Sequence, residues 1–183
     1  LKITDKVTVV KNEENLSSFD KFILPGVGSF PIAIENLKKK KLFDTLKKEV
    51  VNNKKPILGI CLGMQLLFES STEEKLSEGL GLVKGKVRPL TSGENFKVPN
   101  MGWKKIEFNK KSKLLKDLDE DLIFYFVHKY ACYTDENLIS SKFPHSSNFD
   151  CLIEKDNIFG TQFHPEKSQV VGLKLLKNFI EKI

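Results

Sequence analysis

The sequence predicts an α/β protein of three layers, in which a mixed, mostly parallel sheet carries helices on both faces. Two observations favour this fold. Apolar segments of strand length at residues 19–24 and 56–60 are each followed by segments with helical character. The chain repeats this order at its end, with a β-rich segment at 158–163 and a helical one at 170–183. Strands that alternate with helices are typical of doubly wound sheets, in which functional groups collect at the carboxyl ends of the strands.

The first part of the chain supplies most of the helical signal. Residues 7–10 (VTVV) and 19–24 (FDKFIL) have strand composition, whereas 31–40 and 42–52 are amphipathic and rich in Lys and Glu, which predicts two helices. Residues 56–60 form a short apolar run between lysines, as expected of a buried parallel strand. Residues 62–68 are apolar, contain good helix formers and lack proline, so we expect a helix there.

The second part of the chain is mostly β in character. Residues 79–90 combine spaced glycines with β-forming residues, which predicts a bent strand before a turn at 91–95. A Pro-Asn-Met-Gly-Trp loop precedes another strand within 97–108, and 122–133 has strong strand composition. Residues 151–154 and 158–163 are expected to form a hairpin, and an amphipathic helix at 170–183 closes the chain. No repeat or linker interrupts this order, so we expect a single domain over residues 1–183.

Composition excludes several classes of protein. With 183 residues, 40% of them hydrophobic and 30% charged, the chain fits one soluble globular domain. The net charge of +6 comes from lysines that alternate with acidic residues, and Arg88 is the only arginine, which argues against nucleic-acid binding. No apolar run approaches the ~20 residues of a membrane span. Three widely spaced cysteines, Cys61, Cys132 and Cys151, do not suit a disulfide framework and indicate a cytoplasmic location.

Cys61 lies between an expected strand and an expected helix, with Gly59 and Gly63 two residues away on either side. This G-x-C-x-G pattern is typical of a nucleophile elbow, a tight turn that leaves the sulfur above the sheet edge. The glycines allow the strand and the helix to approach closely, because a Cβ atom would clash there. A helix N-terminus favours the thiolate, which is the nucleophilic form. The pattern alone also fits a buried structural cysteine before a core helix.

Two other motifs stand at the ends of expected strands. Residues 25–29 (PGVGS) form a glycine-rich loop that can offer backbone N–H donors, although alone it could be an ordinary turn. His164-Pro165-Glu166 follows the strand at 158–163. A cysteine nucleophile needs a base, and the base needs a group that orients it, which are the roles a His and a Glu two residues apart can fill. Together the three motifs predict a Cys-His-Glu catalytic site.

These motifs resemble those of class I, triad-type glutamine amidotransferases, which have a flavodoxin-like fold. The shared elements are PGVG, GICLGMQ and TQFHPE. The longer stretches ILPGVGSF, GICLGMQLLFESSTE, VPNMGW, YFVH and GTQFHPEKSQ are similar to the glutaminase subunit of imidazole glycerol phosphate synthase, in histidine biosynthesis. The resemblance covers essentially the whole chain. It implies that glutamine is hydrolysed without a cofactor or metal and that ammonia passes to a (β/α)8 cyclase subunit (HisF-like) in a heterodimer.

The resemblance also implies roles for individual residues. Cys61 would be the nucleophile, His164 the base and acid, and Glu166 the residue that orients the histidine. The remaining residues fall into an oxyanion and substrate group and a partner-interface group. The first group comprises Gly26, Val27, Gly28, Leu62, Gln65, His128, Lys129 and Tyr130, and the second comprises Met101, Trp103, Tyr125 and Lys167.

The chain departs from the family pattern at three places. The family usually has His at the position of Asn100 and Ser at the position of Lys129, and these changes affect the expected glutamine contacts. The family also begins with a strand and a helix before the position of Leu1, so we expect the domain to lack that unit. His128 could equally be a core histidine, Trp103 could be a core residue, and Cys132 and Cys151 are expected to be packing residues.

Other functions remain open at this level. The chain could serve a different synthase, such as one that makes a modified sugar, because the sequence does not contain the partner. It could also be a cysteine hydrolase or peptidase without a partner, against which Gln65 and the His-Pro-Glu motif argue. A non-catalytic interaction subunit is disfavoured because Cys61, His164 and Glu166 are all present.

Overall fold

The computed structural model describes residues 4, 6–13, 15–94, 96–107, 109, 111–118, 121–144 and 148–183. The α-helices are α1 Phe30–Lys39, α2 Leu42–Val51, α3 Leu62–Leu66 and α4 Gln169–Lys182, and two short 3₁₀ helices are η1 Leu16–Ser18 and η2 Pro165–Lys167. The strands are β1 Phe22–Gly26, β2 Ile57–Cys61, β3 Phe68–Ser71, β4 Ser77–Glu78, β5 Val83–Pro89, β6 Asn100–Lys105, β7 Ile123–His128, β8 Tyr130–Tyr133, β9 Ile139–Phe143, β10 Phe149–Lys155 and β11 Ile158–Thr161.

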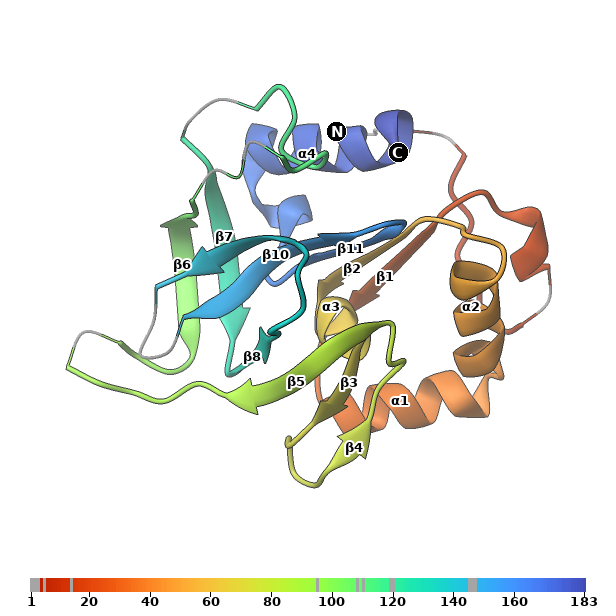
Figure 1. Ribbon diagram of the computed structural model, residues 1–183, viewed down its shortest axis with the longest axis horizontal. Helices are drawn as coiled ribbons and strands as arrows, with labels where there is room; N and C mark the ends of the chain where they lie inside the picture. Colours follow the sequence, from red (N-terminus) through yellow and green to blue (C-terminus); the bar gives the residue numbers. More distant parts are fainter. Residues whose placement is uncertain are drawn as a thin grey trace.

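Within the described part of the chain, these strands form a nine-stranded sheet and a separate two-stranded sheet of β6 and β7. The large sheet has the order β1-β2-β11-β10-β8-β5-β3-β4, with β9 on β10 (Figure 1). Strand β2 is parallel to both β1 and β11, whereas β10 is antiparallel to β11. The three parallel strands at this side of the sheet, β1, β2 and β11, end at the same level, and chemistry is expected at the carboxyl ends of such strands.

Helices cover both faces of the mixed sheet, which confirms the predicted α/β class (Figure 1). The sheet is not mostly parallel as expected, because antiparallel pairs outnumber the parallel pairs among the described strands. On one face, α4 buries Leu175 and Phe179 against Leu58 and Phe159. On the other face, α1, α2 and α3 bury apolar side chains in a second cluster that includes Ile57 from β2. Every residue of β2 is buried, because side chains alternate between two covered faces.

Three other sequence expectations differ from the structure. Residues 7–10 do not form a strand, and Val7 and Val9 are exposed. The helix expected at 62–68 ends at Leu66, because Phe68 pairs with Val83 and begins β3. The strand expected at 122–133 is two strands separated at Lys129, which join different sheets. In addition, strands β4 and β9 were not expected.

Some expectations fall on residues outside the described ranges. These are the start of the chain at Leu1, the end of the turn at Asn95 and the end of a strand at Phe108. Among the described helices, none combines the length and the apolarity that crossing a bilayer requires.

Candidate active site

Cys61 occupies a sharp turn between the last position of β2 and the first residue of α3. Its backbone has φ 53° and ψ −109°, a left-handed conformation that costs energy for a residue with a side chain. The turn depends on its glycines. A Cβ atom on Gly63 would lie 1.7 Å from the Leu24 carbonyl oxygen, and one on Gly59 would lie 2.6 Å from the Met64 nitrogen. The sequence pattern therefore holds the cysteine in a strained elbow.

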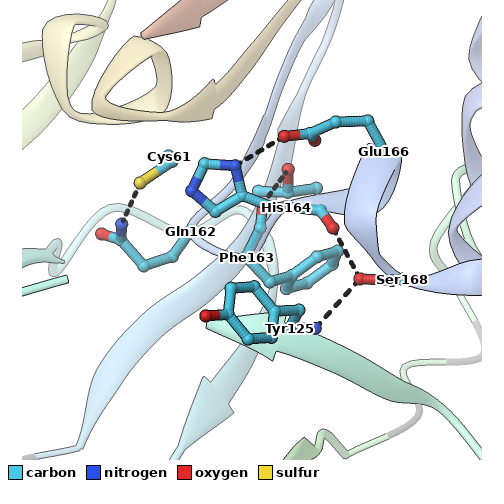
Figure 2. Close-up of polar contacts among 8 residues, drawn as sticks. Cys61, Tyr125, Gln162, Phe163, His164, Glu166 and Ser168 are labelled. Carbon is cyan, nitrogen blue, oxygen red and sulfur yellow. Dashed lines mark hydrogen bonds and ion pairs between the residues drawn. The ribbon is translucent and has the colours of Figure 1, made fainter. Parts of the chain in front are cut away.

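His164 and Glu166 lie at the carboxyl end of β11, around the start of η2. Glu166 Oε1 is 2.7 Å from His164 Nδ1 and so accepts its hydrogen bond. The other ring nitrogen, Nε2, faces the Cys61 thiol (Figure 2). It is buried and makes no hydrogen bond of standard geometry with a described residue. The backbone of His164 is fixed to β7, since its N–H donates to the Tyr125 carbonyl at 2.9 Å.

The electrostatics of this group favour a protonated histidine. Contact with Cys61 and, after it, the hydrogen bond from Nδ1 to Glu166 raise the pKa of His164 to about 9, although burial opposes this. Burial would raise the pKa of Glu166, but its hydrogen bonds and the nearby charges of His164 and Lys167 bring it below the ordinary value. The carboxylate is therefore ionised and stabilises an imidazolium beside the thiol.

The glycine-rich loop lies directly beside the elbow. Gly26 ends β1 and is the register partner of Cys61 across the parallel pair. Val27 is exposed, and Gly28 has φ 101°, a conformation that favours glycine. The loop thus brings flexible backbone to the rim of the cavity that contains the thiol.

A pocket of about 440 Å³ opens above the thiol and collects most of the residues that the sequence analysis selected. Nine of the predicted catalytic and substrate residues line it, namely Val27, Gly28, Cys61, Leu62, Gln65, His128, Lys129, Tyr130 and His164. Two predicted interface residues, Met101 and Lys167, also line it, together with Glu73, Pro99 and Val127. Gly26, Trp103, Tyr125 and Glu166 do not line the pocket. In the described part of the chain, no group of three or more His, Cys, Asp or Glu side chains could hold a metal ion.

Comparison with known proteins identifies the family. The family model described as glutamine amidotransferase class-I matches residues 1–183. The chain belongs to the class I glutamine amidotransferases. It is 46% identical to the imidazole glycerol phosphate synthase subunit HisH 1 of Campylobacter jejuni (strain RM1221), over 94% of this chain and 86% of that protein. It is 45% identical to subunit HisH of Methanocaldococcus jannaschii, over 99% and 90%.

Solved structures agree with this fold. A crystal structure described as a glutamine amidotransferase has a TM-score of 0.72 and 17% identity, over 94% of this chain and 83% of that chain. A glutamine amidotransferase from Thermotoga maritima has a TM-score of 0.65 and 18% identity, over 94% and 81%. The architecture is therefore that of the class I amidotransferases.

The structure describes the surroundings of Asn100 and Lys129, the two positions at which the sequence analysis expected a departure from the family pattern. Asn100 is fully buried, and its Nδ2 lies 2.8 Å from His128 Nε2. His128 Nδ1 lies 2.8 Å from the Tyr130 carbonyl, which can only accept, so Nδ1 carries the proton and a neutral ring accepts from Asn100 at Nε2. Asn100 can therefore supply the N–H that this ring needs. The other position, Lys129, lines the pocket, and its backbone carbonyl accepts from the Leu90 N–H at 2.8 Å.

Sequence reasoning missed three residues of this amidotransferase site. Glu73 lines the pocket and accepts from the Phe30 N–H at the start of α1. Gln162 Nε2 lies 3.8 Å from Cys61 Sγ. Ser168 Oγ donates to the His164 carbonyl at 2.6 Å and accepts from the Tyr125 N–H at 2.9 Å (Figure 2). Each stands in a motif already singled out, but its partner comes from another element, which the motif does not reveal.

The residues predicted for a partner interface form one exposed cluster. Trp103 and Tyr125 are directly opposite in the β6–β7 pair, and their rings meet edge to face at 4.9 Å. Lys167 Nζ lies 5.8 Å from the centre of the Tyr125 ring. Trp103 is 58% exposed and Met101 is 54% exposed, which excludes the alternative that Trp103 is a core residue. We call Met101, Trp103, Tyr125 and Lys167 the aromatic rim.

The other two cysteines differ from Cys61 in their surroundings. Cys132 and Cys151 are fully buried in the core and are not bonded to each other. Burial, followed by the charge of Asp150, raises the pKa of both thiols. Both are therefore held as neutral thiols, consistent with the packing role expected of them.

Proposed function

We propose that this amidotransferase hydrolyses the side-chain amide of glutamine at Cys61, His164 and Glu166. The observation that carries the proposal is the sequence of contacts from the elbow thiol to His164 Nε2 and from His164 Nδ1 to Glu166 at 2.7 Å. These contacts lie at a pocket large enough for an amino acid. A nucleophile, a base and a group that orients the base are the parts that acyl transfer requires.

The reaction proceeds through a thioester. The proton of Cys61 is held on His164 Nε2, and the thiolate attacks the amide carbon of glutamine. The C–N bond then breaks as His164 returns the proton to the departing nitrogen, so ammonia leaves and a glutamyl thioester remains. Water, deprotonated by His164, attacks the thioester, which releases glutamate and restores the thiol. Glu166 stays ionised throughout and stabilises the imidazolium in both halves of the reaction.

Backbone N–H groups stabilise the oxyanion of both tetrahedral intermediates. We assign this role to Leu62, which directly follows the nucleophile, and to the loop of Gly26, Val27 and Gly28. Removal of one such donor typically costs about 3–4 kcal/mol of transition-state stabilisation. Gly28 allows the loop to present or withdraw a donor, because its backbone is free of the constraint a side chain would impose.

The pocket also suits the zwitterionic end of the substrate. Glu73 supplies a carboxylate for the α-ammonium group of glutamine, and Lys129 supplies an ammonium for the α-carboxylate. Gln65, His128 and Tyr130 complete the wall between these charges and the thiol. A carboxylate and an ammonium among the lining residues favour an amino acid over an uncharged amide.

The ammonia is delivered to a second subunit. Relatives in bacteria and archaea, at 42–46% identity, are named as subunits of imidazole glycerol phosphate synthase. We assign this chain the same role in histidine biosynthesis, with a (β/α)8 cyclase as its heterodimer partner. The aromatic rim is the docking surface, since an exposed Trp103 that packs on the half-buried Tyr125 is typical of an interface anchor, and two other rim residues, Met101 and Lys167, line the pocket.

The nitrogen source tests this function. In the assembled enzyme, Cys61→Ala should abolish synthesis from glutamine and leave synthesis from ammonium salts largely intact, because only the production of ammonia is lost. Cys151→Ala makes the same chemical change outside the pocket and should retain both activities. Loss of both activities in Cys61→Ala, or glutamine-dependent synthesis that survives it, would exclude the proposed role.

A further inference from the structure

Gln162 contacts the reacting sulfur from a side that the triad does not occupy. It directly follows β11, its side chain is fully buried, and its backbone N–H donates to the Cys151 carbonyl at 2.9 Å. The side-chain Nε2 lies 3.8 Å from Cys61 Sγ, within hydrogen-bond range for sulfur (Figure 2). Figure 2 also shows His164 on the other side of the thiol.

The surrounding hydrogen bonds determine which end of the Gln162 amide faces the sulfur. The Tyr130 carbonyl can only accept, and it lies 2.9 Å from one side-chain atom of Gln65, which must therefore be the Nε2 donor. The same Nε2 lies 3.2 Å from Gln162 Oε1, which must therefore be an acceptor. The Cys132 thiol also approaches Oε1, at 4.0 Å. Since the oxygen is occupied on this side, the NH₂ group of Gln162 points at Cys61.

We propose that Gln162 is a hydrogen-bond donor to the Cys61 sulfur and that it stabilises and aims the thiolate for attack on glutamine. The donor acts directly on a reacting atom, and the inference rests on the proposed role of Cys61 as the nucleophile. A buried N–H is worth more to a charged sulfur than to a neutral one. The contact therefore favours the thiolate over both the thiol and the thioester.

Two substitutions isolate the donor. Gln162→Glu has the same shape and keeps an oxygen to accept from Gln65, but it replaces the NH₂ group with a second oxygen. Gln162→Met removes the donor without adding charge. The full-length chain is treated with iodoacetamide over a range of pH, and the alkylation of each cysteine is followed by mass spectrometry. Cys132 and Cys151 serve as internal reporters of any opening of the core, because both are fully buried.

Both variants should alkylate Cys61 about tenfold more slowly at neutral pH, the loss expected for one hydrogen bond to a charged group, and should shift the alkylation profile to higher pH. Cys132 and Cys151 should stay protected. In glutamine hydrolysis by the assembled enzyme, Gln162→Glu should lower kcat and leave KM for glutamine nearly unchanged, because Gln162 does not line the pocket.

Three results would overturn the inference. The first is an unchanged rate of Cys61 alkylation in both variants. The second is slower alkylation in Gln162→Glu alone, which would reflect the added charge. The third is slower alkylation together with labelling of Cys132 and Cys151, which would assign Gln162 to packing. The wild-type chain separates this inference from the proposed function. If Cys61 of the wild type is no more reactive than the buried cysteines, the proposed nucleophile is wrong. If it is selectively reactive but insensitive to position 162, only the role of Gln162 fails.

Discussion

Ser168→Ala should destabilise the protein and disturb the catalytic base together. Ser168 is 1% exposed, and its hydroxyl links two backbone segments. It donates a hydrogen bond to the His164 carbonyl and accepts one from the Tyr125 N–H. After substitution the His164 carbonyl still accepts from the Lys167 N–H at 3.1 Å, so only the Tyr125 N–H loses its acceptor. One unsatisfied donor of this kind lowers the free energy of unfolding by about 1–3 kcal/mol. Ser168 precedes α4 but makes no side-chain cap, so no capping energy is lost in addition.

Urea denaturation measures this change, and Ser141→Ala provides the matched control. Ser141 is also buried, but its hydroxyl has no hydrogen-bond partner among the described residues, so its loss should change stability by less than about 0.5 kcal/mol. A loss of 2 kcal/mol in Ser168→Ala corresponds to a fall in Tm of roughly 4–8 °C for a chain of this size. kcat for glutamine should fall as well, because His164 is less firmly held. Equal stability of the two variants would refute the reasoning.

Two other predictions concern charge and docking. Because the pKa of His164 is about 9 in the folded chain against an ordinary 6.5, its stabilising contribution is complete below pH 6.5 and is lost as the pH rises through 9. Urea titrations between pH 6.5 and 9 should show that the free energy of unfolding of the wild type declines, whereas that of His164→Gln does not. Parallel curves of stability against pH for the two proteins would contradict the assignment. Trp103→Ala should weaken binding to the cyclase partner by about 2 kcal/mol in calorimetric titration, as expected of an interface anchor. Leu76→Ala, an exposed apolar residue outside the aromatic rim, should bind normally, and equal affinities of all three proteins would exclude the proposed surface.

The sequence predicted the helices and strands well where the apolar pattern of a segment alone determines its structure. Strands β1, β2 and β11 and helices α1, α2 and α4 follow from local periodicity, because each buries a face against the sheet. Local pattern failed where a distant segment decides the structure. Residues 62–68 have helical composition, but Phe68 enters a strand because it pairs with Val83. Residues 7–10 have strand composition but pair with no described strand, and composition alone cannot provide a ladder.

The candidate site divides in the same way. The elbow at Cys61 could be predicted because its pattern of residues is local, and Gly59 is required by a contact with Met64 only five residues away, although Gly63 is required by Leu24 of β1. The orientation of Gln162 could not be predicted, since it depends on a carbonyl at Tyr130 and an amide at Gln65 that only the folded chain brings together. Glu73 likewise reaches the pocket through a turn that the sequence motif does not specify.

The arrangement of strands suggests where a partner could act on the catalytic base. Tyr125 belongs to the aromatic rim through its ring, while its carbonyl accepts the His164 N–H and its own N–H is held by Ser168. A residue of the proposed docking surface is thus hydrogen-bonded directly to His164, so the surface and the catalytic base are coupled without intervening residues. Among the described strands, β6 and β7 form a separate two-stranded sheet, which contacts the base through the Tyr125 carbonyl. Binding of a partner at the aromatic rim would therefore act directly on the backbone that holds the base, in addition to any change in the oxyanion loop.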